Sequence, residues 1–170
     1  MHRKLPGVLA VFSLLMLQSM VTLADTDAYS RPAGFMRVQV PANDQKLMSS
    51  PFVFFNSGLD SVFSGQLTGE SNQNDADKIV KWDSTIQDYV SAFKADNTGN
   101  SQRNGKFFAD DTSWTPTSMT LSPGDGFFIQ NEHNSAQTVY IMGKIVLDNS
   151  LALTLSQNYN LVSFPVLTTR

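Results

Sequence analysis

Short apolar segments alternate with turn residues along most of this chain. Residues 35–40 alternate apolar and polar side chains, a period of two that is typical of a strand with one buried face. The same alternation returns at residues 138–142 and, over a shorter stretch, at 118–121. Proline, asparagine, aspartate and glycine, which favour turns, gather at 41–44 and 122–126. The pattern predicts β-strands joined by tight turns.

The middle of the chain is predicted to form a β-hairpin. Residues 78–82 and 86–93 are rich in apolar side chains, and a polar loop, 83–85, separates them. A helix over 79–93 is the alternative. The β-branched and aromatic content of the segment favours the hairpin.

Two weaker segments precede the hairpin, and several strands follow it. Residues 47–55 form an apolar segment that Pro51 interrupts, and residues 61–68 form a weak strand with Gly65 at its centre. The remaining predicted strands are 107–108, 127–129, 151–155 and 161–167. About ten short strands and no long helix predict an all-β fold, either an antiparallel β-sandwich or a partly closed barrel.

The sequence contains one internal similarity. Residues 47–52, Leu-Met-Ser-Ser-Pro-Phe, resemble residues 161–166, Leu-Val-Ser-Phe-Pro-Val. Each copy follows an alternating strand and a polar turn that contains asparagine. One interpretation is that the chain holds one complete unit and the opening strands of another, which complete the first unit's sheet. Chance similarity is the alternative.

The N-terminus predicts export. Residues 1–4 are basic, residues 5–23 are uncharged and mostly apolar, and Thr22-Leu23-Ala24 resembles a signal-peptidase site. A membrane anchor is the alternative, but the apolar core spans only residues 8–17, whereas a spanning helix needs about 20 residues. We therefore expect a signal peptide at 1–24, a flexible leader at 25–34 and a single β-domain at 35–170. The predicted location is extracellular or on the cell surface, with the periplasm as an alternative.

Charge and cysteine content narrow the function classes. Without Arg3 and Lys4, ten basic residues face fifteen acidic ones, which gives a net charge of −5 with no basic run. This disfavours nucleic acid, whose binding depends on clustered cations. No membrane span is predicted after signal cleavage. The absence of cysteine indicates that the core alone stabilises the domain, as in many exported bacterial proteins.

Three motifs resemble those of a family of secreted bacterial β-rich proteins of uncharacterised function. The motifs are Asn160-Leu161-Val162-Ser163-Phe164-Pro165, Ala76-Asp77-Lys78-Ile79-Val80-Lys81-Trp82-Asp83 and Pro123-Gly124-Asp125-Gly126-Phe127-Phe128. Tyr159 departs from that family, which often has tryptophan there, and the first copy of the repeated segment is degenerate. The resemblance implies an extracellular β-module and brings no catalytic residues.

The sequence predicts no catalytic residues. His133 is the only histidine after the predicted cleavage site, so a zinc site or a Ser-His-Asp triad would lack partners. Paired aspartates, from the groups 75, 77, 83, 88 and 110, 111, are the remaining basis for a glycoside hydrolase. Calcium is the metal hypothesis, with Asp75 and Asp77 as ligands beside Asn72 and Asn74.

Two tryptophans are candidates for contact with a ligand or partner. Trp82 is predicted to lie in the core. Trp114 lies in a polar loop, where it either stacks on a sugar or partner or folds back as a lid. The leading functional hypothesis is a non-catalytic surface domain with a structural, self-assembly or adhesive role, whose partner is a second copy or another surface protein. A carbohydrate-binding module that contacts a polysaccharide through Trp114 is the alternative, and the aspartate-dependent hydrolase comes next.

Overall fold

The computed structural model describes residues 33–49, 51–111, 113–145 and 155–162. All of them belong to one compact unit of the chain. Its elements are β1 (Ala33–Val40), β2 (Asp44–Ser49), β3 (Phe52–Val53), α2 (Leu59–Val62), β4 (Lys78–Asp83), β5 (Asp88–Lys94), β6 (Phe107–Ala109), β7 (Gly126–Asn131) and β8 (Gln137–Ile145). The predicted signal peptide, most of the leader, and most of the strands at 151–155 and 161–167 lie outside the described residues.

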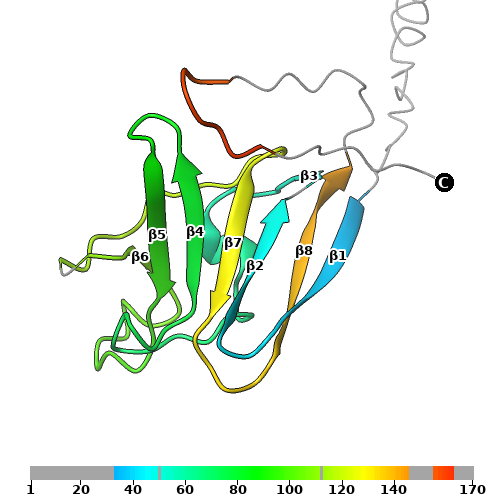
Figure 1. Ribbon diagram of the computed structural model, residues 1–170. Coiled ribbons are helices and arrows are strands. Elements are labelled where there is room, and N and C mark those ends of the chain that lie inside the picture. The colour runs from blue at the N-terminus through cyan, green and yellow to red at the C-terminus, as the bar shows by residue number, and fades with distance from the viewer. Residues whose placement is uncertain (1–32, 50, 112, 146–154, 163–170) are drawn as a thin grey trace, which may run out of the picture. The chain divides into compact units, whose positions relative to one another are not determined.

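The strands form two antiparallel sheets that pack as an open sandwich. One sheet has the order β1-β8-β3 and the other the order β2-β7-β4-β5-β6 (Figure 1). The prediction of an all-β sandwich is therefore confirmed, and the sheets do not close into a barrel. Among the described residues no helix is long and apolar enough to cross a membrane.

Several predicted elements differ from those in the structure. β1 begins at Ala33, two residues before the predicted strand. The hairpin is confirmed, because β4 pairs with β5 from Lys78 opposite Phe93 to Asp83 opposite Asp88, although its loop has four residues, 84–87. The helix over 79–93 is therefore excluded.

The weak strand at 61–68 was a wrong prediction. The segment instead begins within α2, and Leu59, Val62 and Phe63 are all buried there. Their spacing of three and four residues places them on one helical face, which covers one side of the core. Residues 118–121 form no sheet strand either, and only Thr120 makes an isolated bridge, to Gly58.

The core lies between the two sheets. In β8, Val139 and Ile141 are fully buried, whereas Tyr140 and Met142 between them are exposed. The same alternation places Val38 and Val40 of β1 inside. The largest fully buried side chains facing this core are Phe63, Phe107, Phe127, Leu59, Ile79, Leu121, Ile129 and Ile141.

Two turns connect the sheets. The strands on either side of each turn belong to different sheets. β1 pairs with β8 while β2 pairs with β7, so the β1–β2 turn and the β7–β8 turn lie side by side (Figure 1). The buried amide of Asn131 joins the two turns. Its nitrogen donates to the carbonyl oxygens of Pro41, at 2.8 Å, and Ser135, at 2.9 Å, and its oxygen accepts from the backbone N–H of His133 at 3.0 Å.

Ser49 and Leu161, which belong to the two similar segments, both lie beside Gly126 at the beginning of β7. Ser49 of β2 is opposite Gly126, and the Gly126 N–H donates to the carbonyl oxygen of Leu161 at 3.4 Å. Leu161 also explains the glycine, since a Cβ on Gly126 would lie 2.7 Å from its Cγ. Gly124, by contrast, has a φ of 89°, as expected in the third position of a type II turn.

We predict that Asn131→Asp lowers the free energy of unfolding by about 2–5 kcal/mol, because a buried carboxylate would face two carbonyl oxygens. Urea denaturation would measure the change. Asn134→Asp is the matched control in the same turn: Asn134 is exposed and only accepts, from Asn43 at 3.0 Å, which an aspartate can also do. Equal losses in the two variants would contradict the proposed role of Asn131.

Candidate functional site

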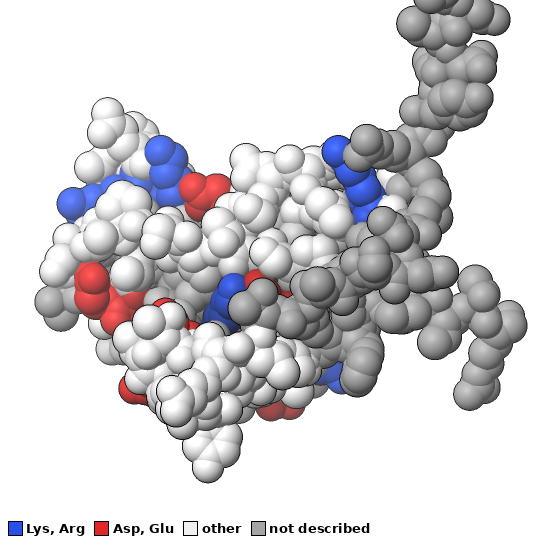
Figure 2. Space-filling model, turned by 90° about the horizontal axis from the view of Figure 1, so that it is seen from above, with Lys and Arg blue, Asp and Glu red and all other residues white. Residues whose placement is uncertain are grey.

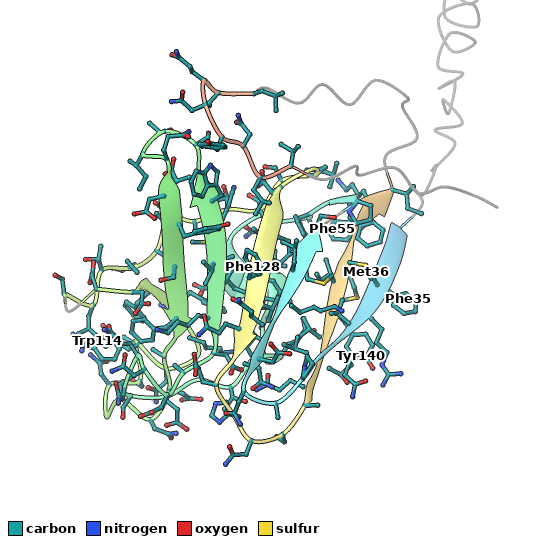
Figure 3. All side chains as sticks on the ribbon, in the orientation of Figure 1. Phe35, Met36, Phe55, Trp114, Phe128 and Tyr140 are labelled. Carbon is teal, nitrogen blue, oxygen red and sulfur yellow. The ribbon has the colours of Figure 1, made fainter. Side chains whose placement is uncertain are left out.

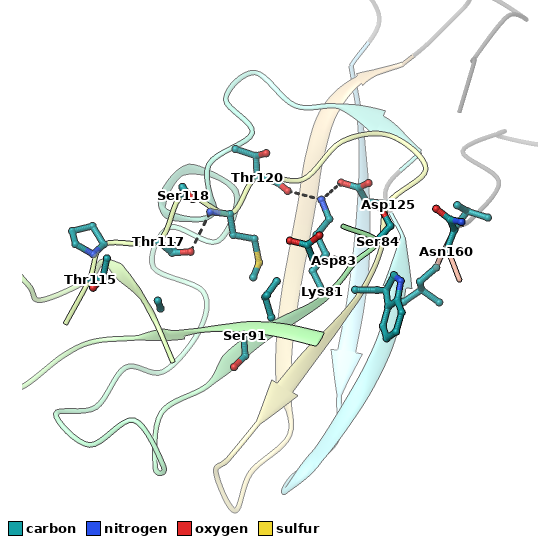
Figure 4. A pocket seen from close by; sticks show the side chains of 17 residues that line it. Lys81, Asp83, Ser84, Ser91, Thr115, Thr117, Ser118, Thr120, Asp125 and Asn160 are labelled. Atoms are coloured by element: carbon teal, nitrogen blue, oxygen red, sulfur yellow. Dashed lines mark hydrogen bonds and ion pairs between the residues drawn. The ribbon is translucent and has the colours of Figure 1, made fainter. Parts of the chain in front are cut away.

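A groove of about 560 Å³ lies at one end of the sandwich. Its floor comes from β4 and β5, including Lys81 and Val90, and one wall is the segment 115–120 (Figure 4). Asp125 and residues 160–162 close another side. None of its lining residues comes from the three-stranded sheet, so the groove lies where the wider sheet has no partner sheet above it.

Backbone hydrogen bonds fix the wall of the groove in place. Ala109 donates to the carbonyl of Thr115 at 2.8 Å, and Thr117 donates to that of Phe107 at 3.2 Å. Farther along, Leu121 donates to the carbonyl of Ser57 at 3.0 Å. The wall is therefore attached to β6 at one end and to the segment before α2 at the other.

An ion pair crosses the groove. The Lys81 ammonium donates to the Asp125 carboxylate at 2.6 Å and to the Thr120 carbonyl at 3.0 Å, and both side chains are about one quarter exposed (Figure 4). The same carboxylate accepts from the N–H of Ser122 at 2.8 Å, so the Pro-Gly turn and β4 are joined. Figure 2, which looks onto an end of the molecule, shows small separate groups of charged residues on a mostly uncharged surface.

Asp83 is the other charged residue that lines the groove. The backbone N–H of Thr85 donates to its carboxylate at 2.8 Å, and this hydrogen bond lowers the pKa of Asp83 below its ordinary value. The carboxylate is therefore ionised at neutral pH. A glycosidase needs one carboxyl that stays protonated to act as the acid, and Asp83 is shifted in the opposite direction.

The other aspartates suggested as a hydrolytic pair have separate structural roles. Asp110 forms an ion pair with Lys78 at 2.9 Å and accepts from the hydroxyl of Ser91. Asp111 accepts from the N–H of Ser113. Asp88 is opposite Asp83 in the hairpin and accepts from the N–H of Tyr89, the next residue.

Asp75 and Asp77, the candidate calcium ligands, have different surroundings. Asp75 is exposed and accepts from the amide of Asn72 at 2.7 Å within its own turn. Asp77 is fully buried, and its two carboxylate oxygens accept from the N–H groups of Thr68, at 2.7 Å, and Glu132, at 3.1 Å. Among the described residues no group of three or more His, Cys, Asp or Glu side chains converges on a possible metal position.

We predict that Asp77→Ala lowers the free energy of unfolding by at least about 2 kcal/mol, because it leaves two buried N–H groups without an acceptor. Asp75→Ala should cost less than about 1 kcal/mol, since its partner is exposed. Thermal unfolding with calcium and with a chelator would compare the two. A calcium-dependent stabilisation that both substitutions abolish would contradict this structural role and favour a metal site.

His133 lies beside Asp77 without a close hydrogen bond to it. The distance from its Nε2 to the Asp77 carboxylate is 3.8 Å, and this nitrogen is buried with no hydrogen-bond partner among the described residues. No hydroxyl of the described residues donates a hydrogen bond to this nitrogen. The geometry therefore does not form a catalytic triad.

Among the described residues, Lys94 is the one cationic side chain that is buried. It is 4% exposed, and burial lowers its pKa, an effect that Asp96, Asp60 and Asp77 partly oppose. Its ammonium lies 6.0 Å from the centre of the Phe107 ring. Lys94 does not line the groove, so the lowered pKa of this residue reflects its burial in the fold and does not indicate a role in the groove.

Trp114 packs as a lid. Its indole lies 5.4 Å from the ring of Phe93 and 5.5 Å from that of Phe108, both edge-on, and the Arg103 guanidinium lies 4.7 Å from its centre. Its backbone has a φ of 55°. Trp114 is not among the residues that line the groove, so a sugar site there would depend on other residues.

The prediction that Trp82 lies in the core is wrong. It is partly exposed, its ring contacts Tyr89 edge-on at 5.0 Å, and its indole N–H donates to the carbonyl of Tyr159 at 2.9 Å. The alternation along β4 explains the difference, because Ile79 is fully buried and Trp82, three positions later in the strand, projects from the other face.

A second surface is apolar. On the outer face of the three-stranded sheet, Phe35 is 70% exposed, Met142 is 59% exposed, and the two are directly opposite in the β1–β8 pairing. Tyr140 lies next to them on the same face (Figure 3). Val53 of β3 and Phe55, two residues later, are also exposed. Phe35, Phe55 and Met142 line a hollow of about 530 Å³.

Comparisons with protein-family models, with curated proteins and with solved structures find no match to this chain. The resemblance to secreted bacterial β-rich proteins therefore stays a prediction, and the function has to be argued from the two surfaces.

Proposed function

We propose that this protein is a non-catalytic, exported β-domain that assembles with copies of itself on the cell surface. The observation that supports the proposal best is the apolar outer face of β1 and β8, with Phe35, Met142 and Tyr140 exposed on it. Arg37 and Lys144 share this face by register, and the Lys144 ammonium lies 5.5 Å from the centre of the Phe55 ring. Exposed apolar side chains grouped in this way favour a partner.

The edge of the same sheet supports a second copy as the partner. β1 has eight residues and pairs only with β8 among the described strands. It contains no proline and one charged residue, Arg37, so it lacks most of the features that prevent edge strands from pairing. Two antiparallel edges related by a two-fold axis have complementary hydrogen-bonding groups, so the strand can pair with itself.

The apolar face and the edge are continuous, which favours one interface over two. Phe35 belongs to the edge strand, and its neighbour across the sheet is Met142. Pairing of β1 with β1 of a second copy would place the two Phe35 side chains on one face of a six-stranded sheet, where they would bury apolar area against each other. Such burial contributes about 25 cal/mol for each Å² removed from water.

The arrangement of charges in the groove supports a non-catalytic role. The groove contains an ion pair, Lys81 with Asp125, and an aspartate whose pKa is lowered, so its described residues offer no obvious proton donor for hydrolysis. Binding of a ligand in the groove is compatible with this role.

We predict that the double variant Phe35→Lys, Met142→Lys raises the dissociation constant of self-association at least tenfold, which corresponds to about 1.4 kcal/mol. The substitutions add charge to the proposed interface and remove apolar area from it. Sedimentation velocity of the purified protein over a wide concentration range would measure the change.

The control is Ile86→Lys, which changes an equally exposed apolar residue in the turn between β4 and β5. It should leave self-association unchanged. A wild-type protein that stays monomeric at all concentrations, or a double variant that associates as strongly as the wild type, would refute the proposal.

A further inference from the structure

The groove between β4, β5 and the segment 115–120 offers side chains, and few backbone groups, to a ligand. At Lys81, β4 is paired with both β7 and β5. β5 is paired with β6 only from Ala92 to Lys94, so its edge is open before Ser91. The wall is bonded to β6 and to Ser57. An extended peptide, which binds by adding a strand to an edge, would find only the three residues 88–90 of β5 to pair with.

Two of the three charges in the groove compensate each other, and Asp83 leaves the lining with one negative charge. Its charged lining residues are Lys81, Asp83 and Asp125, and Lys81 is already paired with Asp125. An anionic ligand would face two carboxylates, and a cationic ligand would meet an ammonium that is fixed in place. An uncharged ligand avoids both costs, because charges buried without a partner are strongly unfavourable.

The uncharged part of the lining combines hydroxyl groups with small apolar surfaces. The hydroxyls come from Ser84, Thr115, Thr117, Ser118 and Thr120, and Figure 4 shows several of them along one wall. Apolar contacts come from Val90, Ala109, Pro116, Met119 and Leu161. Hydroxyls and carboxylates hydrogen-bond the hydroxyls of a sugar, while the apolar groups contact its C–H faces.

We propose that this groove binds a neutral oligosaccharide, with Lys81 and Asp83 contacting sugar hydroxyls from the floor and Ser118 and Thr120 contacting them from the wall. An ammonium has three donors, and Asp125 and the Thr120 carbonyl use two of those of Lys81, so a third remains for a ligand. The proposal does not depend on self-association, because the groove shares no residue with the face of Phe35 and Met142.

The test is an NMR titration of the isotope-labelled protein with four neutral hexasaccharides: maltohexaose, cellohexaose, xylohexaose and chitohexaose. Hexamers of galacturonic acid and of glucosamine are the charged comparators. We expect at least one neutral hexasaccharide to bind and to shift the amide signals of Lys81, Ser118 and Thr120. The charged hexamers should bind at least tenfold more weakly.

Ser118→Trp should reduce that binding at least tenfold, because the indole would fill the groove. Ser101→Trp is the matched control, an exposed serine in the loop between β5 and β6 that does not line the groove. Asp83→Asn, compared with Asp88→Asn outside the groove, gives a second readout if the tryptophan variant does not fold.

The proposal is refuted if no neutral hexasaccharide binds, if the charged hexamers bind as tightly, or if both tryptophan variants bind equally well. Signal shifts confined to β1 and β8 would also refute it. Because self-association is measured separately by sedimentation, failure of this proposal leaves that result unaffected.

Discussion

The fold depends on two turns at which the chain passes from one sheet into the other. β1 and β2 belong to different sheets, as do β7 and β8, so the turns that join them lose the ladder hydrogen bonds that an ordinary hairpin provides. Buried backbone groups without partners are costly, and side chains replace the missing bonds here. Asn131 bonds the carbonyls of both turns, and Asp77 accepts from Glu132 in one turn and from Thr68 in a separate segment. Asn131 and Asp77 are thus buried polar residues that the change of sheet requires.

The unequal width of the two sheets explains where both candidate surfaces lie. A three-stranded sheet cannot cover a five-stranded one, so α2 and the segment 115–121 cover part of the remainder and leave the groove over β4 and β5. On the other side of the sandwich, the narrow sheet has an outer face that no described segment of the chain covers. Phe35, Tyr140 and Met142 are exposed there because they alternate with the buried residues of β1 and β8.

Much of the fold could be predicted from the sequence, because alternation and turn chemistry are local signals. The strands around Val38, Ile79 and Val139 were found in this way, as was the Pro-Gly turn. α2 was missed because four residues are too few for helical periodicity to be distinguished from a strand. The inward or outward direction of Trp82 depends on register, which a short strand rich in apolar residues does not specify. The groove was missed as well: Lys81, Ser118 and Asp125 come from three segments, and only the fold brings them together.

The two surfaces would respond differently to solution conditions, and this follows from their chemistry. The face around Phe35 and Met142 is apolar, so association through it should strengthen in salts such as sulfate, which favour burial of apolar area. The groove depends on hydrogen bonds around the Lys81–Asp125 pair, whose atoms are 2.6 Å apart and only partly exposed. Salt screens such a short, sheltered pair weakly, because screening acts mainly over distances beyond about 8 Å at physiological ionic strength. Under the two proposals, self-association would therefore be sensitive to salt and ligand binding in the groove would not.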